Sequence, residues 1–267
     1  VHTCPAALGY SFAGGTTDGP GQFDFTQGSN TSNCFWNMLS GFLSTPTKEQ
    51  IECHHPKPIL LNSGRASLPY SWDPDRVPIS IFRIGQCFIL NVPADVATMA
   101  GRRLRKAVRQ VLVDGGLENP VITIAGLANS YTHYVTTFEE YAGQRYEAAS
   151  TLYGPHTLSA YIQEFNRIAS DLIEGAPSVT CEAPSDLSRK QISLIPPVGL
   201  DLIGFGKKYG SVAVEAEDQY RRGDKVMVSF RSANPRNNQR IEGTFLTVDR
   251  LNDDGSWTTL YVDGDWC

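Results

Sequence analysis

The sequence predicts an α/β domain with a mixed sheet and flanking helices, followed by an incomplete all-β sandwich. An apolar strand, an amphipathic helix and another apolar strand follow one another over residues 87–125, which is the order of a βαβ unit. Beyond about residue 210 the apolar residues alternate with a period of two, which is typical of strands. We therefore expect a first domain over 1–190, a connection over 191–209 and a second domain over 210–267.

Short apolar runs with clear turns mark the βαβ unit. Ile79–Arg83 and Cys87–Val92 are expected strands around a turn at Gly85, and Val121–Ala125 is a third strand. Between the last two, apolar residues recur at helical spacing, with basic residues on the opposite face and glycines at 115 and 116 as the stop. The apolar set is Val96, Met99, Ala100, Leu104, Ala107, Val108, Val111 and Leu112.

Two further helices and four strands complete the expected elements. Thr136 and Thr137 each precede a glutamate by three residues, which indicates a capping box at a helix start. A longer amphipathic helix is expected to end at Gly175, from the spacing of Leu158, Tyr161, Ile162, Phe165, Ile168, Leu172 and Ile173. The expected strands of the second domain are Val212–Glu215, Lys225–Phe230, Thr244–Asp249 and Trp257–Val262, with a hairpin turn at Asn252–Gly255.

Composition excludes several classes of protein. Of 267 residues, 41% are hydrophobic and 19% charged, which allows a sizeable core and argues against disorder. A net charge of -5 without a basic block argues against a nucleic-acid partner. No apolar run approaches the roughly 18 to 20 residues that a membrane helix needs. Six cysteines without a C-x-x-C pair argue against a zinc ribbon, and with the glycosylation acceptor at Asn30 they favour a secreted or cell-surface protein.

Two polar residues follow the strands of the predicted sheet, where sites gather in open α/β folds. Asp95 comes after the Cys87–Val92 strand, and Tyr134 follows the Val121–Ala125 strand. Taken alone, Asp95 fits a helix N-cap better than a catalytic carboxylate, and His133 fits a packed histidine better than a ligand. The glycine-rich stretch 14–21 fits a surface loop. The residues by themselves predict a site at Asp95 and Tyr134 without a complete catalytic set.

Four stretches resemble the neutral (non-lysosomal) ceramidases: 7–19 (ALGYSFAGGTTDG), 98–105 (TMAGRRLR), 126–141 (GLANSYTHYVTTFEEY) and 144–158 (QRYEAASTLYGPHTL). The resemblance spans essentially the whole chain. It implies that residues 1–190 are the later part of the family's catalytic domain and 210–267 the start of its C-terminal immunoglobulin-like domain. Both ends of the chain look cut, so we expect an N-terminal remainder of the same enzyme as a partner.

The resemblance implies zinc-dependent hydrolysis of the N-acyl bond of ceramide to sphingosine and a fatty acid. The family binds zinc through two histidines, a glutamate and a tyrosine, and the tyrosine matches Tyr134. The glutamate position falls on Asp95, whose side chain is one methylene shorter. A second family tyrosine, which hydrogen-bonds near the scissile amide, matches Tyr146. The family's serine and two zinc histidines have no counterpart here, so the isolated chain is expected to be inactive.

The resemblance also implies a disulfide between Cys4 and Cys53, and part of a Ca²⁺ or Mg²⁺ site at Asp263 and Asp265. The expected substrate, ceramide, would come from a membrane or micelle surface. Two alternatives stay open at this point. One is a non-catalytic lipid-binding module on the same scaffold, which the change to Asp95 favours, and the other is an amidase for another N-acyl lipid.

Overall fold

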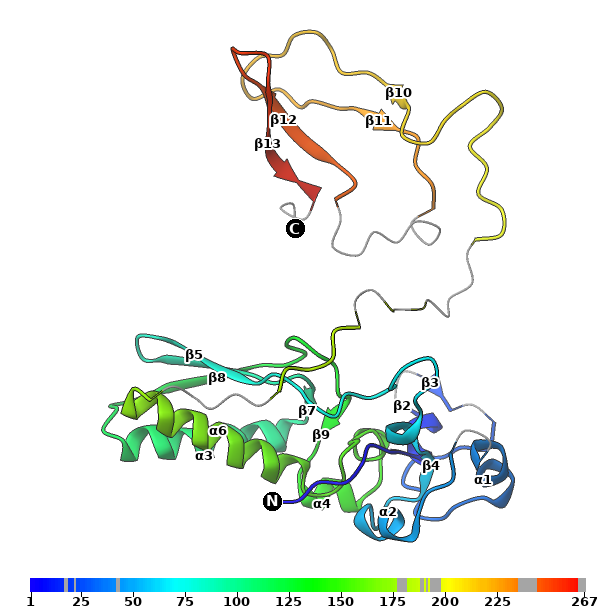
Figure 1. Cartoon of the computed structure of the whole chain (residues 1–267), viewed down its shortest axis with the longest axis vertical. Helices are drawn as coiled ribbons and strands as arrows, with labels where there is room; N and C mark the ends of the chain where they lie inside the picture. The colour runs from blue at the N-terminus through cyan, green and yellow to red at the C-terminus, as the bar shows by residue number, and fades with distance from the viewer. Residues whose placement is uncertain are drawn as a thin grey trace. The chain divides into compact units, whose positions relative to one another are not determined.

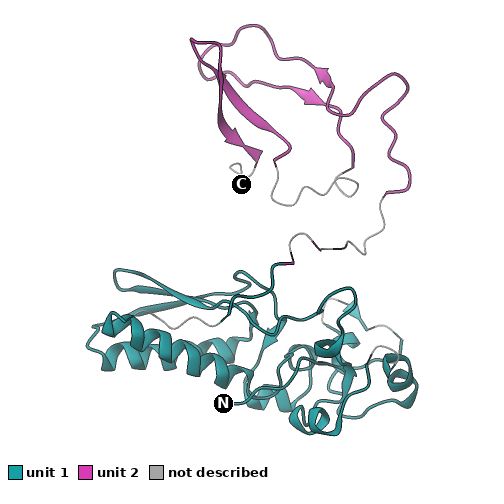
Figure 2. Ribbon diagram, in the orientation of Figure 1, with its two compact units in different colours: residues 1–186 teal, residues 187–267 magenta. Residues whose placement is uncertain are grey.

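The computed structural model describes residues 1–16, 19–21, 23–41, 44–176, 182–187, 190, 192, 198–234 and 244–263. The chain divides into two compact units, Val1–Asp186 and Leu187–Cys267 (Figure 2). The first combines helices with sheets, and the described residues of the second contain strands. The domain limits that the sequence analysis places at 190 and 209 stay predictions.

A three-stranded mixed sheet forms the centre of the first unit. Its strands are β5 (Ser80–Ile84), β6 (Cys87–Asn91) and β8 (Val121–Ala125), in the order β5-β6-β8. β5 pairs antiparallel with β6, and β6 pairs parallel with β8, with Cys87 opposite Val121. The crossover between the parallel strands is α3 (Thr98–Asp114). The structure therefore confirms the βαβ unit that the sequence predicts.

The core lies between this sheet and two long helices, α3 and α6 (Thr157–Glu174), which lie along the same face of the sheet (Figure 1). Buried residues recur every four positions along α3, since they share one face of the helix. They are Ala100, Leu104, Val108 and Leu112, and they pack with Phe88, Leu90, Leu158, Phe165 and Ala169. Each large side chain buried here contributes about 1.5 to 3 kcal/mol. Met99, expected on the apolar face, is instead 43% exposed. It precedes the buried row that begins at Ala100 by one residue, which is a rotation of about 100° around a helix.

The ends of two helices agree with the sequence signals. In α4 (Phe138–Ala142), Thr137 accepts from the Glu140 amide and Glu140 accepts from the Thr137 amide, so the capping box is present at this pair. α6 ends at Gly175, which has φ +67°, a conformation that favours glycine.

The rest of the first unit consists of short elements that support the site. They are β1 (Leu8–Gly9), the 3-10 helix η1 (Tyr10–Ala13), β2 (Gly15–Thr16), β3 (Gly19–Pro20), α1 (Cys34–Gly41), α2 (Lys48–Cys53), β4 (Ile59–Leu61), the 3-10 helix η2 (Ser63–Arg65), β7 (Asp95–Val96), β9 (Tyr134–Val135) and α5 (Tyr146–Ala149). The glycine-rich stretch differs from the expected plain loop. Gly15 pairs with Pro20, so β2 and β3 form a small hairpin, which the positive φ of Gly15 permits.

The described part of the second unit contains two antiparallel strand pairs. β10 (Val212–Val214) pairs with β11 (Ser229–Phe230), and β12 (Thr247–Leu251) pairs with β13 (Trp257–Val262) around the predicted turn. The strand expected over 225–230 is reduced to its last two residues. The structure thus confirms strands in this unit, and their assembly into an immunoglobulin-like sandwich stays an expectation. No helix in the described ranges is both long and apolar enough to cross a membrane.

Candidate active site

Asp95 and Tyr134 lie side by side on two short parallel strands. β7 pairs with β9 with Asp95 opposite Tyr134 and Val96 opposite Val135. Val135 is buried in the core, and Val96 packs against the same core. Since successive side chains of a strand point to opposite faces, the acid and the phenol project from the face away from that core. The structure therefore brings the two predicted site residues together.

Backbone hydrogen bonds set this register. The Asp95 amide donates to His133 O at 2.8 Å, and the Ala97 amide donates to Val135 O at 3.0 Å. Helix α3 begins only at Thr98, with Ala97 at the N-cap position and no side-chain cap. The helix-cap interpretation of Asp95 is therefore wrong, because its carboxylate belongs to a strand three residues before the helix. Residues 127, 129 and 133 have φ values of 56°, 66° and 58°, so the loop that delivers Tyr134 folds through several left-handed turns.

Tyr146 joins this pair from the start of α5. Its ring meets the Tyr134 ring edge to face at 5.6 Å between centroids. It also stacks on Phe12 at 6.1 Å between centroids, and the Phe12 and His133 ring centroids are 6.0 Å apart. The Tyr146 amide donates to Gln27 Oε1 at 2.7 Å, which occupies one of the donors left free at a helix start. The predicted catalytic tyrosine thus lies against the predicted ligand tyrosine, in an aromatic setting.

A third phenol contacts Asp95. Tyr131 Oη donates to Asp95 Oδ2 at 3.2 Å. Burial, and then the Asp95 carboxylate, raise the pKa of Tyr131 to about 12. The pKa of Tyr134 is also raised, by burial first and then by Asp95 and Tyr146. These carboxylate effects show that Asp95 is electrostatically coupled to both phenols, and that without a cation the phenols stay protonated at neutral pH.

His133, the residue before Tyr134, packs against the rings of Phe12 and Tyr131. Its pKa is lowered, chiefly by burial, although Asp73 and Asp95 act in the opposite direction. It is therefore neutral at pH 7. Its ring is 5.1 Å from that of Tyr131, and its backbone forms an isolated bridge with Thr151. These contacts agree with the sequence interpretation of His133 as a packed histidine.

The donors gathered here fit part of a metal site. A carboxylate and a phenol are oxygen ligands, and zinc accepts oxygen at about 2.0 to 2.2 Å. Among the described residues, no group of three or more His, Cys, Asp or Glu could hold a metal ion. Asp95 and Tyr134 could therefore supply two ligands, and a full tetrahedral shell would need others from outside this set.

The other predicted site residues lie elsewhere. Cys4 and Cys53 form a disulfide in the structure. Asn30 lies in the loop before α1, and Cys34 and Cys87 carry free thiols. Asp263 Oδ2 accepts from the Phe245 amide at 3.1 Å, and Asp263 Oδ1 accepts from Thr244. Asp265 lies outside the described residues, as do Cys181 and Cys267.

Sequence reasoning missed four residues that shape the site. Tyr131 contacts Asp95, Phe12 stacks on Tyr146, and Gln27 accepts from the Tyr146 amide. The fourth, Lys57, is buried and donates to the carbonyl of Thr151, two residues after α5 ends. Tyr131 stood in the predicted loop and could have been found from its place before Tyr134. The others are distant in sequence, and no local pattern connects them with the site.

An α/β layer with an acid and phenols at the ends of its strands is typical of an enzyme site. The family model described as "Neutral/alkaline non-lysosomal ceramidase, N-terminal" matches residues 1–163, and the corresponding C-terminal model matches 165–267. The chain belongs to the neutral/alkaline non-lysosomal ceramidase family.

Individual relatives agree with this family. "Neutral ceramidase 3" of Arabidopsis thaliana is 52% identical over 100% of this chain and 37% of its own length. "Neutral ceramidase" of Oryza sativa subsp. japonica is 50% identical over 100% of this chain and 34% of its own length. Among solved structures, "Ceramidase complexed with C2" has a TM-score of 0.64 and 40% identity, over 99% of this chain and 41% of that one. The neutral ceramidase of Pseudomonas aeruginosa has a TM-score of 0.58 and 36% identity, over 99% and 42%. The chain therefore spans little more than a third of these curated relatives.

Proposed function

We propose that this chain supplies part of the active site of a zinc-dependent ceramidase, which hydrolyses the N-acyl bond of ceramide to sphingosine and a fatty acid. The observation that carries the proposal is the register of Asp95 opposite Tyr134, with the Tyr146 ring against Tyr134. In a member of the ceramidase family, this arrangement supports a site in which the two predicted zinc ligands lie beside the predicted catalytic tyrosine.

Asp95 and Tyr134 would hold the zinc ion from this side. When bound, zinc polarises an amide carbonyl and lowers the pKa of a bound water to about 7. Asp95 is one methylene shorter than the family's glutamate, and the parallel pairing fixes its backbone directly beside Tyr134. Tyr131 adds a hydrogen bond to Asp95 Oδ2, which orients the carboxylate and leaves its other oxygen for a cation.

Tyr146 would act on the substrate itself. Its phenol O–H can donate a hydrogen bond to the oxygen on which negative charge develops as the amide is attacked. The stacked Phe12 ring and the edge contact with Tyr134 restrict the orientation of Tyr146. Phe12 also covers one side of the ring with apolar surface, which excludes water and suits the alkyl chain of a lipid amide.

The remaining features of the whole enzyme are proposals on the same basis. We infer that the missing zinc ligands and the serine come from the rest of the protein, since the chain matches only 37% of "Neutral ceramidase 3", and that the isolated chain is inactive. The second unit would belong to an immunoglobulin-like domain, with Asp263 and Asp265 at a Ca²⁺ or Mg²⁺ site. The disulfide and the acceptor at Asn30 support a secreted or cell-surface enzyme that takes ceramide from a membrane or micelle.

The test uses the full-length enzyme with ceramide in micelles. Asp95→Ala and Tyr134→Phe should each lower the zinc content and reduce kcat/KM by at least about 100-fold, while Tyr146→Phe should reduce kcat and leave the zinc content unchanged. Glu118→Gln, an exposed acid beyond α3, is the control and should behave as wild type. Unchanged turnover and zinc content in Asp95→Ala would remove Asp95 from the site. A wild type that hydrolyses another N-acyl lipid but not ceramide would favour the amidase alternative. A wild type that hydrolyses neither would favour the non-catalytic lipid-binding module.

A further inference from the structure

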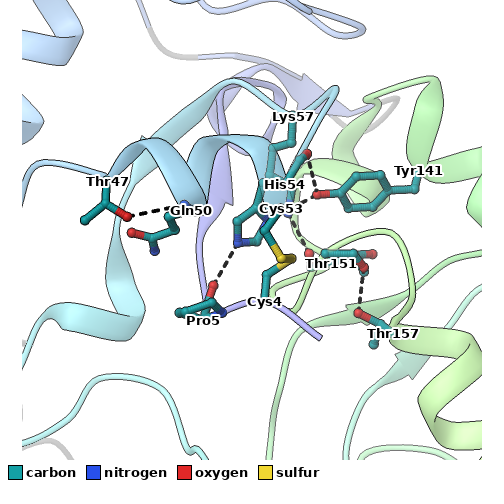
Figure 3. Close-up of a disulfide and its surroundings, with 11 residues drawn as sticks. Cys4, Pro5, Thr47, Gln50, Cys53, His54, Lys57, Tyr141, Thr151 and Thr157 are labelled. Atoms are coloured by element: carbon teal, nitrogen blue, oxygen red, sulfur yellow. Dashed lines mark hydrogen bonds between the residues drawn. A yellow bond between two sulfur atoms is a disulfide. The ribbon is translucent and has the colours of Figure 1, made fainter. Parts of the chain in front are cut away.

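A buried lysine contacts the backbone next to the segments that carry Tyr134 and Tyr146. The chemistry described above does not use it. Lys57 is 2% exposed. Its ammonium donates to Thr151 O at 2.6 Å and to Ala7 O at 3.1 Å, and it lies 5.0 Å from the centroid of the Tyr141 ring. Figure 3 shows Lys57 beside Tyr141 and Thr151, close to the Cys4–Cys53 disulfide. No ion pair within the described residues involves Lys57.

Such a group is costly to bury. An ammonium without a carboxylate partner loses its hydration, and two neutral carbonyls and one aromatic ring restore only part of that free energy. Burial accordingly moves the pKa of Lys57 well below its usual value. An apolar side chain of similar length would fill the same space at lower cost. What the apolar side chain could not do is bind two backbone carbonyls from segments far apart in the sequence.

The first of these carbonyls belongs to a segment that contacts both tyrosines. Thr151 follows α5, which begins at Tyr146. Thr151 also forms an isolated antiparallel bridge with His133, and the Tyr134 amide donates to Ser150 O at 3.3 Å. Its hydroxyl lies 3.1 Å from that of Thr136, which is two residues after Tyr134 in the sequence. The position of the backbone at residues 150–151 therefore determines how β9 and α5 lie relative to each other.

The second carbonyl belongs to the segment that leads to Phe12. The Ala7 amide donates to Leu152 O at 3.0 Å, so this segment runs beside the one that contains Thr151. β1 and η1 follow directly, and η1 contains Phe12, whose ring stacks on Tyr146. Lys57 thus connects, through one atom, the backbones that deliver Tyr134, Tyr146 and Phe12.

We propose that Lys57 is a positioning residue, which fixes the contact between the Tyr134 and Tyr146 rings by holding Thr151 and Ala7. The catalytic consequence of this role rests on the proposed function, because the orientation of the two rings affects a rate only if they belong to an active site. As a 1 Å displacement of a catalytic group can cost about 100-fold in rate, loss of this support should reduce kcat more than it affects KM.

The experiment uses the full-length enzyme with ring-labelled tyrosine. In the wild type, NMR should detect a cross-ring NOE between Tyr134 and Tyr146. Lys57→Met should lose this NOE and reduce kcat on ceramide about 10- to 100-fold, with KM within about threefold. Tyr141→Phe is the matched control, because it removes the phenol that contacts His54 in the same junction and leaves both donations of Lys57 in place. It should keep the NOE and kcat.

A second control separates positioning from stability. Leu112→Ala opens a cavity in the core and should lower the denaturant midpoint of unfolding, yet keep the NOE. If Lys57→Met does not fold, Lys57→Gln, which retains one amide donor, takes its place. An NOE that persists in the Lys57 variant, or one that Leu112→Ala loses as well, would overturn the proposal. A wild type that does not hydrolyse ceramide would refute the proposed function alone, because the NOE would still decide the role of Lys57.

Discussion

Tyr131 donates a hydrogen bond to the carboxylate of Asp95, and Asp95 is the register partner of Tyr134. One acid therefore lies between two phenols that are three residues apart in the sequence. Between the two phenols, His133 has a left-handed backbone with φ 58°, and the Asp95 charge contributes to raising the pKa of both phenols. This relationship makes the charge of Asp95 measurable through its neighbours.

Removal of the Asp95 charge should lower the pKa of Tyr131. Burial, and then the hydrogen bond and charge of Asp95, raise that pKa to about 12 because a phenolate beside a carboxylate is disfavoured. In Asp95→Asn we expect the pKa to fall below that value, although burial keeps it above the ordinary one. NMR titration of ring-labelled tyrosine measures it. Asp114→Asn, at the end of α3, is the control, and an unchanged Tyr131 pKa in Asp95→Asn would contradict the assigned contact.

Acid should destabilise the first unit through His54. Burial, and then the charge of Lys57, lower the pKa of this histidine to about 4 from 6.5. Below pH 6.5, His54 binds a proton in the unfolded chain but not in the folded one. Stability that is present above pH 6.5 is therefore lost as the pH falls towards 4. His54 accounts for about 3 kcal/mol of this loss.

Urea unfolding between pH 4 and 8 measures this effect. His54→Gln should have a flatter dependence than wild type over that window. His55→Gln, an exposed neighbour, should retain the wild-type dependence. Parallel curves for wild type and His54→Gln would show that His54 does not titrate in this way.

Loss of the Cys4–Cys53 disulfide should destabilise the first unit substantially. The bridge closes a loop with a sequence separation of 49, and in the chain-entropy model a loop of that size contributes about 4 kcal/mol. Denaturant unfolding of the Cys4→Ser, Cys53→Ser double variant measures the loss. Cys34→Ser changes an exposed free thiol and should stay within about 0.5 kcal/mol of wild type. Equal stability of all three proteins would mean that the bridge is absent in solution.

Gly154→Ala should cost more than Gly175→Ala. Both glycines have left-handed backbones, with φ +84° and +67°, so each alanine is strained by about 1 to 2 kcal/mol. At Gly154 the added Cβ would also lie 2.5 Å from Cys4 Sγ, whereas nothing lies within 4 Å at Gly175. We expect an additional cost of about 1 to 3 kcal/mol at Gly154. Thermal unfolding compares the two, and equal losses would argue against close packing on the disulfide.

Much of the fold could be predicted because its signals are local. Leu104, Val108 and Leu112 repeat at helical spacing, and the α3 crossover between two apolar strands follows from that pattern. The capping box at Thr137 needs only four residues. The interpretation of Asp95 as a helix cap failed because a two-residue strand such as β7 has no period of its own, and its partner Tyr134 is 39 residues away.

The amino-acid sequence alone predicts the order of strands and helices in the first unit, the family, and Asp95, Tyr134 and Tyr146 as the residues of interest. These three residues can be identified from their residue types and from short sequence motifs. Other relationships are visible only in the folded chain. Asp95 pairs with Tyr134, Tyr131 and Phe12 join the site, and Lys57 donates to the backbone at Thr151. Hydrogen bonds and ring contacts between distant segments depend on how the chain folds back on itself. Such loop closure produces no periodic pattern in the residues that it brings together.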